Sequence, residues 1–115
     1  MKKPERFDPK KPFTVIALYR PRRGKAAGLR RVLATHLPNL RAWGLATKRP
    51  GTMLRSRDGT VLEVFEWKSV KAVGDAHSEP RVLKMWKAFD EVCTYVTLGS
   101  LKEAGDVFPG FERLE

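Results

Sequence analysis

The sequence contains only one cysteine, Cys93, among its 115 residues. A lone cysteine excludes an intrachain disulfide and a cysteine-based metal cluster, and it suits a reducing compartment. No apolar run approaches the roughly 20 residues that a membrane-spanning helix needs. The basic start is followed by Phe7-Asp8-Pro9 and not by an apolar stretch, so we expect no secretory signal. The sequence therefore predicts a cytoplasmic protein with one folded domain and no membrane association.

Acidic residues are scarce in the first half of the chain. Residues 1–57 hold 16 lysines and arginines against 2 acidic residues, whereas residues 58–115 hold 7 basic and 11 acidic residues. The formal net charge of the whole chain is +10. Such a field can attract nucleic acid or anionic ligands without specifying what is bound. A solvated basic face of a soluble protein is the simpler interpretation.

The two ends of the chain are poor in regular hydrophobic patterning. Residues 1–12 mix prolines with basic residues, and we predict a disordered basic tail there. Residues 102–115 place Val107, Phe108 and Phe111 around a Pro-Gly pair, which predicts a C-terminal arm. This arm would supply a short extra strand or dock on a partner.

Hydrophobic periodicity predicts a strand and a helix at the start of the domain. The β-branched and aromatic run at 13–20 is typical of a strand, and leucines spaced by three and four predict a helix after it. Pro38 cannot donate the backbone hydrogen bond of a helix interior, so we expect this helix to end or kink near His36 and Leu37. A second strand is predicted at 45–56, interrupted at Pro50-Gly51 by a bulge or bend.

The second half of the domain begins with a predicted type I′ hairpin turn at Asp58-Gly59. A strand at 60–67 follows it. Ser69 is suited to cap a short helix, Pro80 suits the first turn of a longer one, and a last strand is predicted at 95–98.

The resulting order is strand, helix, strand, strand, helix, strand. A ferredoxin-like α+β fold, the βαββαβ split sandwich with an antiparallel sheet, satisfies this order over residues 13–101. In the strand at 60–67, Leu62 and Val64 point to one face while Phe65 and Trp67 point to the other. We therefore expect helices to cover one face of the sheet and a partner subunit to cover the other.

An RNA-recognition module has the same element order and would suit the basic charge. Its RNA-binding face would need aromatics framed by glycine and a basic residue. Here Glu63 and Glu66 would repel phosphate, and the glycine–aromatic pattern is missing. The sequence thus disfavours nucleic acid as the partner.

The region from residue 60 to 101 resembles the antibiotic-biosynthesis-monooxygenase-like family. The matching residues are Glu63-Val64-Phe65-Glu66-Trp67-Lys68-Ser69, Ala72, Ala76-His77, Pro80, Trp86 and the segment 92–95. The resemblance implies a dimeric α/β barrel, in which two copies pack their sheets face to face, with a pocket between each sheet and its helices. Some members oxidise polycyclic aromatic substrates there without metal or flavin, so we expect a homodimer and no cofactor.

The resemblance also implies roles for individual residues. The substrate, as its own enolate or phenolate, would supply the electron to dioxygen, so the pocket must bind a planar ring and favour the anion. We predict Trp67 and His77 as the catalytic residues, with His36 as another candidate proton acceptor and Arg55 to stabilise the anion. The other predicted ligand-binding residues are Tyr19, Glu63, Phe65, Trp86 and Tyr95. Core packing is the simpler role for the tryptophans, and helix capping is the simpler role for His77.

Two departures from the family pattern bear on activity. Oxidising members pair an asparagine with the tryptophan four residues later, but here Glu63 occupies the asparagine position and would oppose a substrate anion. The positions that haem-degrading relatives use hold Ala17, Ala76 and Trp86, so haem degradation is not expected. Two hypotheses stay open: a cofactor-independent oxygenase of a planar aromatic or quinol compound, and a non-catalytic homodimer that binds a small apolar or anionic ligand.

Overall fold

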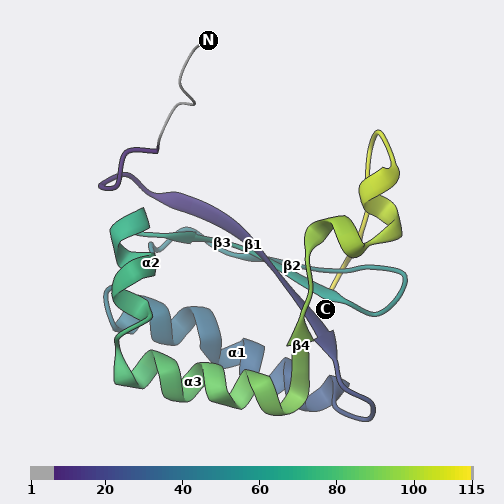
Figure 1. The fold of residues 1–115 in the computed structure, drawn as a ribbon, viewed down its shortest axis with the longest axis horizontal. Coiled ribbons are helices and arrows are strands. Elements are labelled where there is room, and N and C mark those ends of the chain that lie inside the picture. The colour runs from purple at the N-terminus through teal and green to yellow at the C-terminus, as the bar shows by residue number, and fades with distance from the viewer. Residues whose placement is uncertain (1–6, 115) are drawn as a thin grey trace.

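The computed structural model describes residues 7–114 (Figure 1). Within these residues, three α-helices lie on one face of a five-stranded antiparallel sheet. The strand order is β4-β1-β3-β2-β5. This α+β arrangement is compatible with the ferredoxin-like fold that the element order predicts. No helix in the described part of the chain is long and apolar enough to cross a membrane.

The sheet is built around its two longest strands, β1 (Phe13–Pro21) and β3 (Val61–Trp67). β2 (Thr52–Arg55) pairs with the other edge of β3, and β4 (Cys93–Tyr95) pairs with the other edge of β1. β5 (Glu112–Arg113) extends the sheet beyond β2. The first and third predicted strands are therefore confirmed.

The first helix, α1 (Ala26–Ala42), runs through Pro38. Of the two outcomes predicted near His36 and Leu37, an end or a kink, the end is contradicted because the helix continues to Ala42. Its buried stripe continues past the proline to Leu40, which is fully buried. Burial of this apolar stripe against the sheet offsets the one backbone hydrogen bond that proline removes.

The second predicted strand, at 45–56, is mostly not a strand. Only β2 pairs continuously with β3, and before it Ala46 makes an isolated bridge to Trp67. Gly51 passes close to the helix layer, since a Cβ there would lie 2.9 Å from Cδ2 of Leu37. Residues 47–51, between the Ala46 bridge and Thr52, are therefore outside the sheet, and the predicted interruption at Pro50-Gly51 lies within this gap.

The hairpin between β2 and β3 has a different turn from the predicted one. A type I′ turn needs positive φ at both central residues. Gly59 has φ of 91°, but no non-glycine residue in the described part of the chain has positive φ, Asp58 included. The N–H of Ser56 donates to the carbonyl of Thr60 at 2.9 Å, which closes a three-residue loop with glycine in its left-handed position.

Two helices separate β3 from β4. α2 (Val70–Ala76) begins at the predicted cap, where Ser69 Oγ accepts the N–H of Ala72 at 3.0 Å. α3 (Pro80–Val92) begins with the predicted proline in its first turn and passes directly into β4. The last predicted strand, 95–98, therefore shares only Tyr95 with β4, because the helix leads straight into the sheet at Cys93 and a 3-10 turn begins at Leu98.

The C-terminal segment covers part of the sheet face opposite the helices (Figure 1). It contains two 3-10 turns, η1 (Leu98–Ser100) and η2 (Lys102–Gly105), and the short strand β5 that the sequence offered as one possibility. Leu101, between the two turns, packs on Leu18 and Leu62. Beyond this cover the same face stays open.

The predicted N-terminal tail, residues 1–12, lies partly outside the described residues, which begin at Phe7. The ring of Phe7 contacts that of Phe13 edge-on at 5.2 Å. The N–H of Lys11 donates to the carbonyl of Asp8, and Pro9 accepts from Lys71 in α2. Residues 7–12 thus lie against the start of β1 and the start of α2.

Candidate functional site

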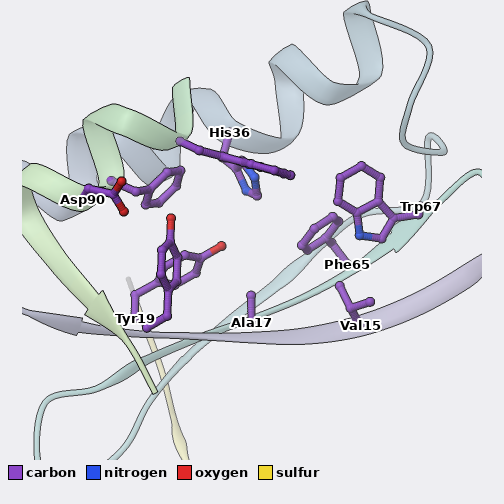
Figure 2. Close-up of a pocket in the computed structure, with 10 residues that line it drawn as sticks. Val15, Ala17, Tyr19, His36, Phe65, Trp67 and Asp90 are labelled. Atoms are coloured by element: carbon purple, nitrogen blue, oxygen red, sulfur yellow. The ribbon is translucent and has the colours of Figure 1, made fainter. Parts of the chain in front are cut away.

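A cavity of about 400 Å³ lies between the sheet and helices α1 and α3, and we call it the aromatic cavity (Figure 2). Its walls are mainly aromatic and aliphatic side chains. No lysine or arginine is among the lining residues in the described part of the chain, and Asp90 supplies a carboxylate at the α3 side. The lining residues are Val15, Ala17, Tyr19, His36, Phe65, Trp67, Trp86, Phe89, Asp90 and Tyr95.

The floor of the aromatic cavity is formed by side chains of β1 and β3 that point to the same face of the sheet. Val15, Ala17 and Tyr19 lie on one face of β1 because successive strand side chains alternate between faces. β3 pairs with β1 in the register Val15↔Phe65, so Phe65 and Trp67 share that face. Ala17 carries only a methyl group at the middle of this row, which leaves space between the larger rings.

A buried carboxylate lies on the same face of the sheet as this floor. Glu63 is fully buried and pairs in register with Ala17 across β1 and β3. Its Oε1 accepts the hydroxyl of Tyr19 at 2.7 Å and lies 2.8 Å from Nδ1 of His36. Its Oε2 has no hydrogen-bond partner among the described residues. A buried charge is costly unless it is paired, so the contacts to Tyr19 and His36 are what compensate it.

The bond to Glu63 determines which nitrogen of His36 is available. Because a carboxylate oxygen is an acceptor only, we assign Nδ1 of His36 as the donor to Glu63, which leaves Nε2 as the ring nitrogen that is not bonded to it. The ring lines the aromatic cavity and is held edge-on by Phe65 and Phe89, with ring centroids 5.3 and 5.1 Å away. An imidazole oriented by a carboxylate, with its other nitrogen free, is the arrangement of a general base.

Two tyrosines line the aromatic cavity where β1 pairs with β4, since Tyr19 of β1 is in register with Tyr95 of β4. Burial, and then the neighbouring charge of Glu63, raise the pKa of Tyr19 far above its ordinary value. Burial also raises the pKa of Tyr95 to about 12. Both hydroxyls therefore stay protonated at neutral pH and can donate hydrogen bonds.

The structure brings most of the predicted site residues together. The five that line the aromatic cavity are Tyr19, Phe65, Trp67, Trp86 and Tyr95. Glu63 is not itself a lining residue, but it is hydrogen-bonded to two residues that are, Tyr19 and His36. The candidate proton acceptor His36 is thus in the site.

Arg55 and His77 lie elsewhere. Arg55 is at the edge of the sheet, where its Nη2 pairs with Oε2 of Glu112 at 2.9 Å. His77 is exposed at the C-terminal cap of α2, with Nδ1 2.8 Å from the carbonyl of Val73. Its ring meets that of Trp86 edge-on at 5.1 Å, but it does not line the aromatic cavity.

Sequence reasoning missed four lining residues: Val15, Ala17, Phe89 and Asp90. Strand alternation from Tyr19 would have found the first two. Helical spacing of three and four residues from Trp86 would have found the other two. The pairing of His36 with Glu63 had no comparable signal, because the residues are 27 positions apart on different elements.

No family model, curated protein or solved structure matches this chain. Among the described residues, no group of three or more His, Cys, Asp or Glu side chains is placed to hold a metal ion.

Proposed function

We propose that this protein is a cofactor-independent oxygenase that deprotonates a planar aromatic compound and lets the resulting anion react with dioxygen. The observation that carries this proposal is the His36–Glu63 hydrogen bond at the wall of the aromatic cavity. The predicted resemblance to the antibiotic-biosynthesis-monooxygenase-like family is consistent with it.

The aromatic cavity suits a flat ring. Its volume of about 400 Å³ is in the range of small-molecule sites. Trp67 from β3 and Trp86 from α3 offer ring surfaces from the two layers, and aromatic pairs favour offset stacking or edge-to-face contact. The hydroxyl of Tyr95 can donate to a ring oxygen.

In this proposal His36 Nε2 takes the acidic proton of the bound compound. Glu63 stabilises the imidazolium that forms, as a carboxylate does for a catalytic histidine. For an acidic ring methylene, the substrate carbon then gains one oxygen atom of dioxygen and becomes a carbonyl. The other oxygen atom leaves as water with both methylene hydrogens. The substrate supplies all four electrons, so no further reductant is needed.

The proposal includes a cytoplasmic homodimer arranged as a dimeric α/β barrel. The exposed part of the sheet face opposite the helices supports it, since Ile16 is 48% exposed there although it lies in the interior strand β1. A second copy would bury this apolar side chain.

A second candidate function is a non-catalytic homodimer that binds a small apolar ligand. The lining supports it, because no lysine or arginine in the described part of the chain is placed to stabilise an anion in the aromatic cavity. For the same reason, an anionic ligand fits this cavity less well than a neutral one.

Oxygen uptake with a panel of hydroquinones and tricyclic aryl ketones tests the first function. We expect His36→Ala to lower the rate roughly 100-fold, the smaller end of what a general base contributes. His77→Ala is the matched control and should retain the wild-type rate, since His77 lies outside the cavity.

Equal rates in wild type and His36→Ala would overturn the assignment of the base. The second function would be favoured if a panel compound binds tightly to the wild type but causes no oxygen uptake. Quenching of tryptophan fluorescence measures the binding.

A further inference from the structure

A second hollow lies on the outer side of the helix layer, between α1 and α3, and we call it the basic groove. Its volume is about 510 Å³, and it shares no lining residue with the aromatic cavity. It is lined by Arg31, Val32, Thr35, Asn39, Trp43, Arg81, Lys84, Met85 and Ala88.

The basic groove runs along both helices. Four lining residues recur every four positions, a distance of about 18 Å at the rise of an α-helix. They are Arg31, Thr35 and Asn39 of α1 and Trp43 at its C-cap. Val32, Met85 and Ala88 give it an apolar floor, and Asn39 Nδ2 lies 3.7 Å from the sulfur of Met85. The hollow is thus long and apolar enough for two to three turns of a helix.

The lining is strongly positive. It holds Arg31, Arg81 and Lys84, and no aspartate or glutamate of the described chain lines it. Arg81 pairs with Glu79 and lies 5.1 Å above the ring of Trp43. Arg31 and Lys84 have no ion-pair partner among the described residues. Two cations on opposite sides of an apolar floor therefore lack a counter-charge.

We propose that the basic groove is the docking site for an acidic amphipathic helix of a partner protein. An amphipathic helix lays its apolar stripe into such a groove, and carboxylates beside the stripe would reach Arg31 on one side and Lys84 on the other. The partner supplies the negative charge that the groove lacks.

The same surface is less suited to nucleic acid. Single-stranded nucleic acid stacks its bases on open aromatic faces and follows a continuous line of cations. Here one face of Trp43 is covered by the Arg81 guanidinium, and the floor between the cations is apolar.

Fluorescence anisotropy tests the proposal with a labelled synthetic helical peptide, which carries leucines at positions i, i+3, i+4 and i+7 and flanking glutamates. We expect it to bind wild-type protein, and a scrambled peptide of the same composition to bind at least tenfold more weakly. The double variant Arg31→Glu/Lys84→Glu should lose roughly tenfold or more in affinity, because two attractive pairs become repulsive. The control Arg23→Glu/Lys87→Glu makes the same change in net charge outside the groove lining and should keep the wild-type affinity.

Equal binding of the helical and scrambled peptides, or an equal loss in both double variants, would show unspecific attraction to a basic surface and overturn the proposal. Absence of helical-peptide binding at low salt would also overturn it. Binding of a single-stranded oligonucleotide that is lost only in Arg31→Glu/Lys84→Glu, without peptide binding, would reassign the groove to nucleic acid.

Discussion

The hydroxyl of Tyr19 donates a 2.7 Å hydrogen bond to Oε1 of Glu63, which lies diagonally across the β1–β3 pair. Both side chains are buried on the helix-covered face of the sheet. This bond and the contact to His36 are the only hydrogen bonds to the Glu63 carboxylate within the described residues. The stability of the fold and the proposed chemistry therefore depend on the same carboxylate.

Tyr19→Phe should lower the free energy of unfolding by about 1.5–3 kcal/mol, because a buried charged acceptor loses a donor. Urea denaturation measures this change. Tyr95→Phe is the matched control and should stay within about 0.5 kcal/mol of wild type, since the half-exposed Tyr95 hydroxyl has no hydrogen bond among the described residues. Equal effects in the two variants would mean that the Glu63 bond contributes nothing measurable.

Asp90→Asn should change which ligands enter the aromatic cavity. Asp90 places a carboxylate in a lining without lysine or arginine in the described chain, so a carboxylated ring compound is repelled more than its neutral analogue. With an effective dielectric constant of about 40 and a separation of about 6 Å, the repulsion corresponds to roughly tenfold in affinity. Quenching of tryptophan fluorescence measures both affinities. Asp75→Asn removes the same charge from α2 outside the lining and should leave the preference unchanged.

Leu101→Ala should lower the free energy of unfolding by about 2–5 kcal/mol, the usual cost of removing a buried leucine side chain. Leu101 is 3% exposed and packs on Leu18 and Leu62, whereas Leu98 of η1 is 43% exposed. Leu98→Ala should therefore cost less than about 0.5 kcal/mol. Thermal and urea denaturation of both variants measure the two changes in the free energy of unfolding. A negligible cost at Leu101 would contradict the docking of the C-terminal segment on the sheet.

Gly74→Ala and Gly24→Ala should change the free energy of unfolding in opposite directions. A Cβ at either position meets nothing within 4 Å, so the backbone decides the outcome. Gly74 is inside α2, where alanine should stabilise the protein by about 0.5–1 kcal/mol. Gly24 has φ of +73°, where alanine should cost about 1–2 kcal/mol. Melting temperatures of the two variants give the test, and a shift in the same direction for both would refute this account.

Asp58 should contribute stability that is lost in acid. The Ser56 hydroxyl, followed by the N–H of Thr60, lowers the pKa of Asp58 from 3.8 to about 2. Because the folded state binds this proton less readily than the unfolded chain, the contribution is complete above about pH 4 and disappears as the pH falls to about 2. Since 48% of the side chain is exposed, solvent screening limits it to roughly 1 kcal/mol.

The difference in unfolding free energy between wild type and Asp58→Asn isolates this carboxylate from the others that titrate in acid. It should be constant from pH 7 to pH 4 and vanish near pH 2. An Asp58 titration midpoint near 3.8 in the folded protein, measured by NMR of the side-chain carboxyl, would contradict the assignment.

Local patterns predicted the two long strands, the Ser69 cap and the Pro80 helix start, because each depends on neighbours within a few residues. The predictions that were wrong concern segments in which contacts with residues distant in the sequence outweigh the local pattern. Pro38 was expected to end or kink α1, but α1 does not end there, because its apolar stripe through Leu40 packs on the sheet. The segment at 45–56 has strand-like composition, yet only Thr52–Arg55 reaches a partner strand along its length.

The sequence by itself determined the element order and which side chains of β1 and β3 share a face, since both follow from alternation and helical spacing along the chain. It also supplied six of the residues at the candidate site: Tyr19, Glu63, Phe65, Trp67, Trp86 and Tyr95. Only the tertiary structure decided that His36, and not His77, meets the carboxylate of Glu63. That choice depends on how α1 docks across the sheet, and a contact between side chains 27 residues apart leaves no trace in local periodicity.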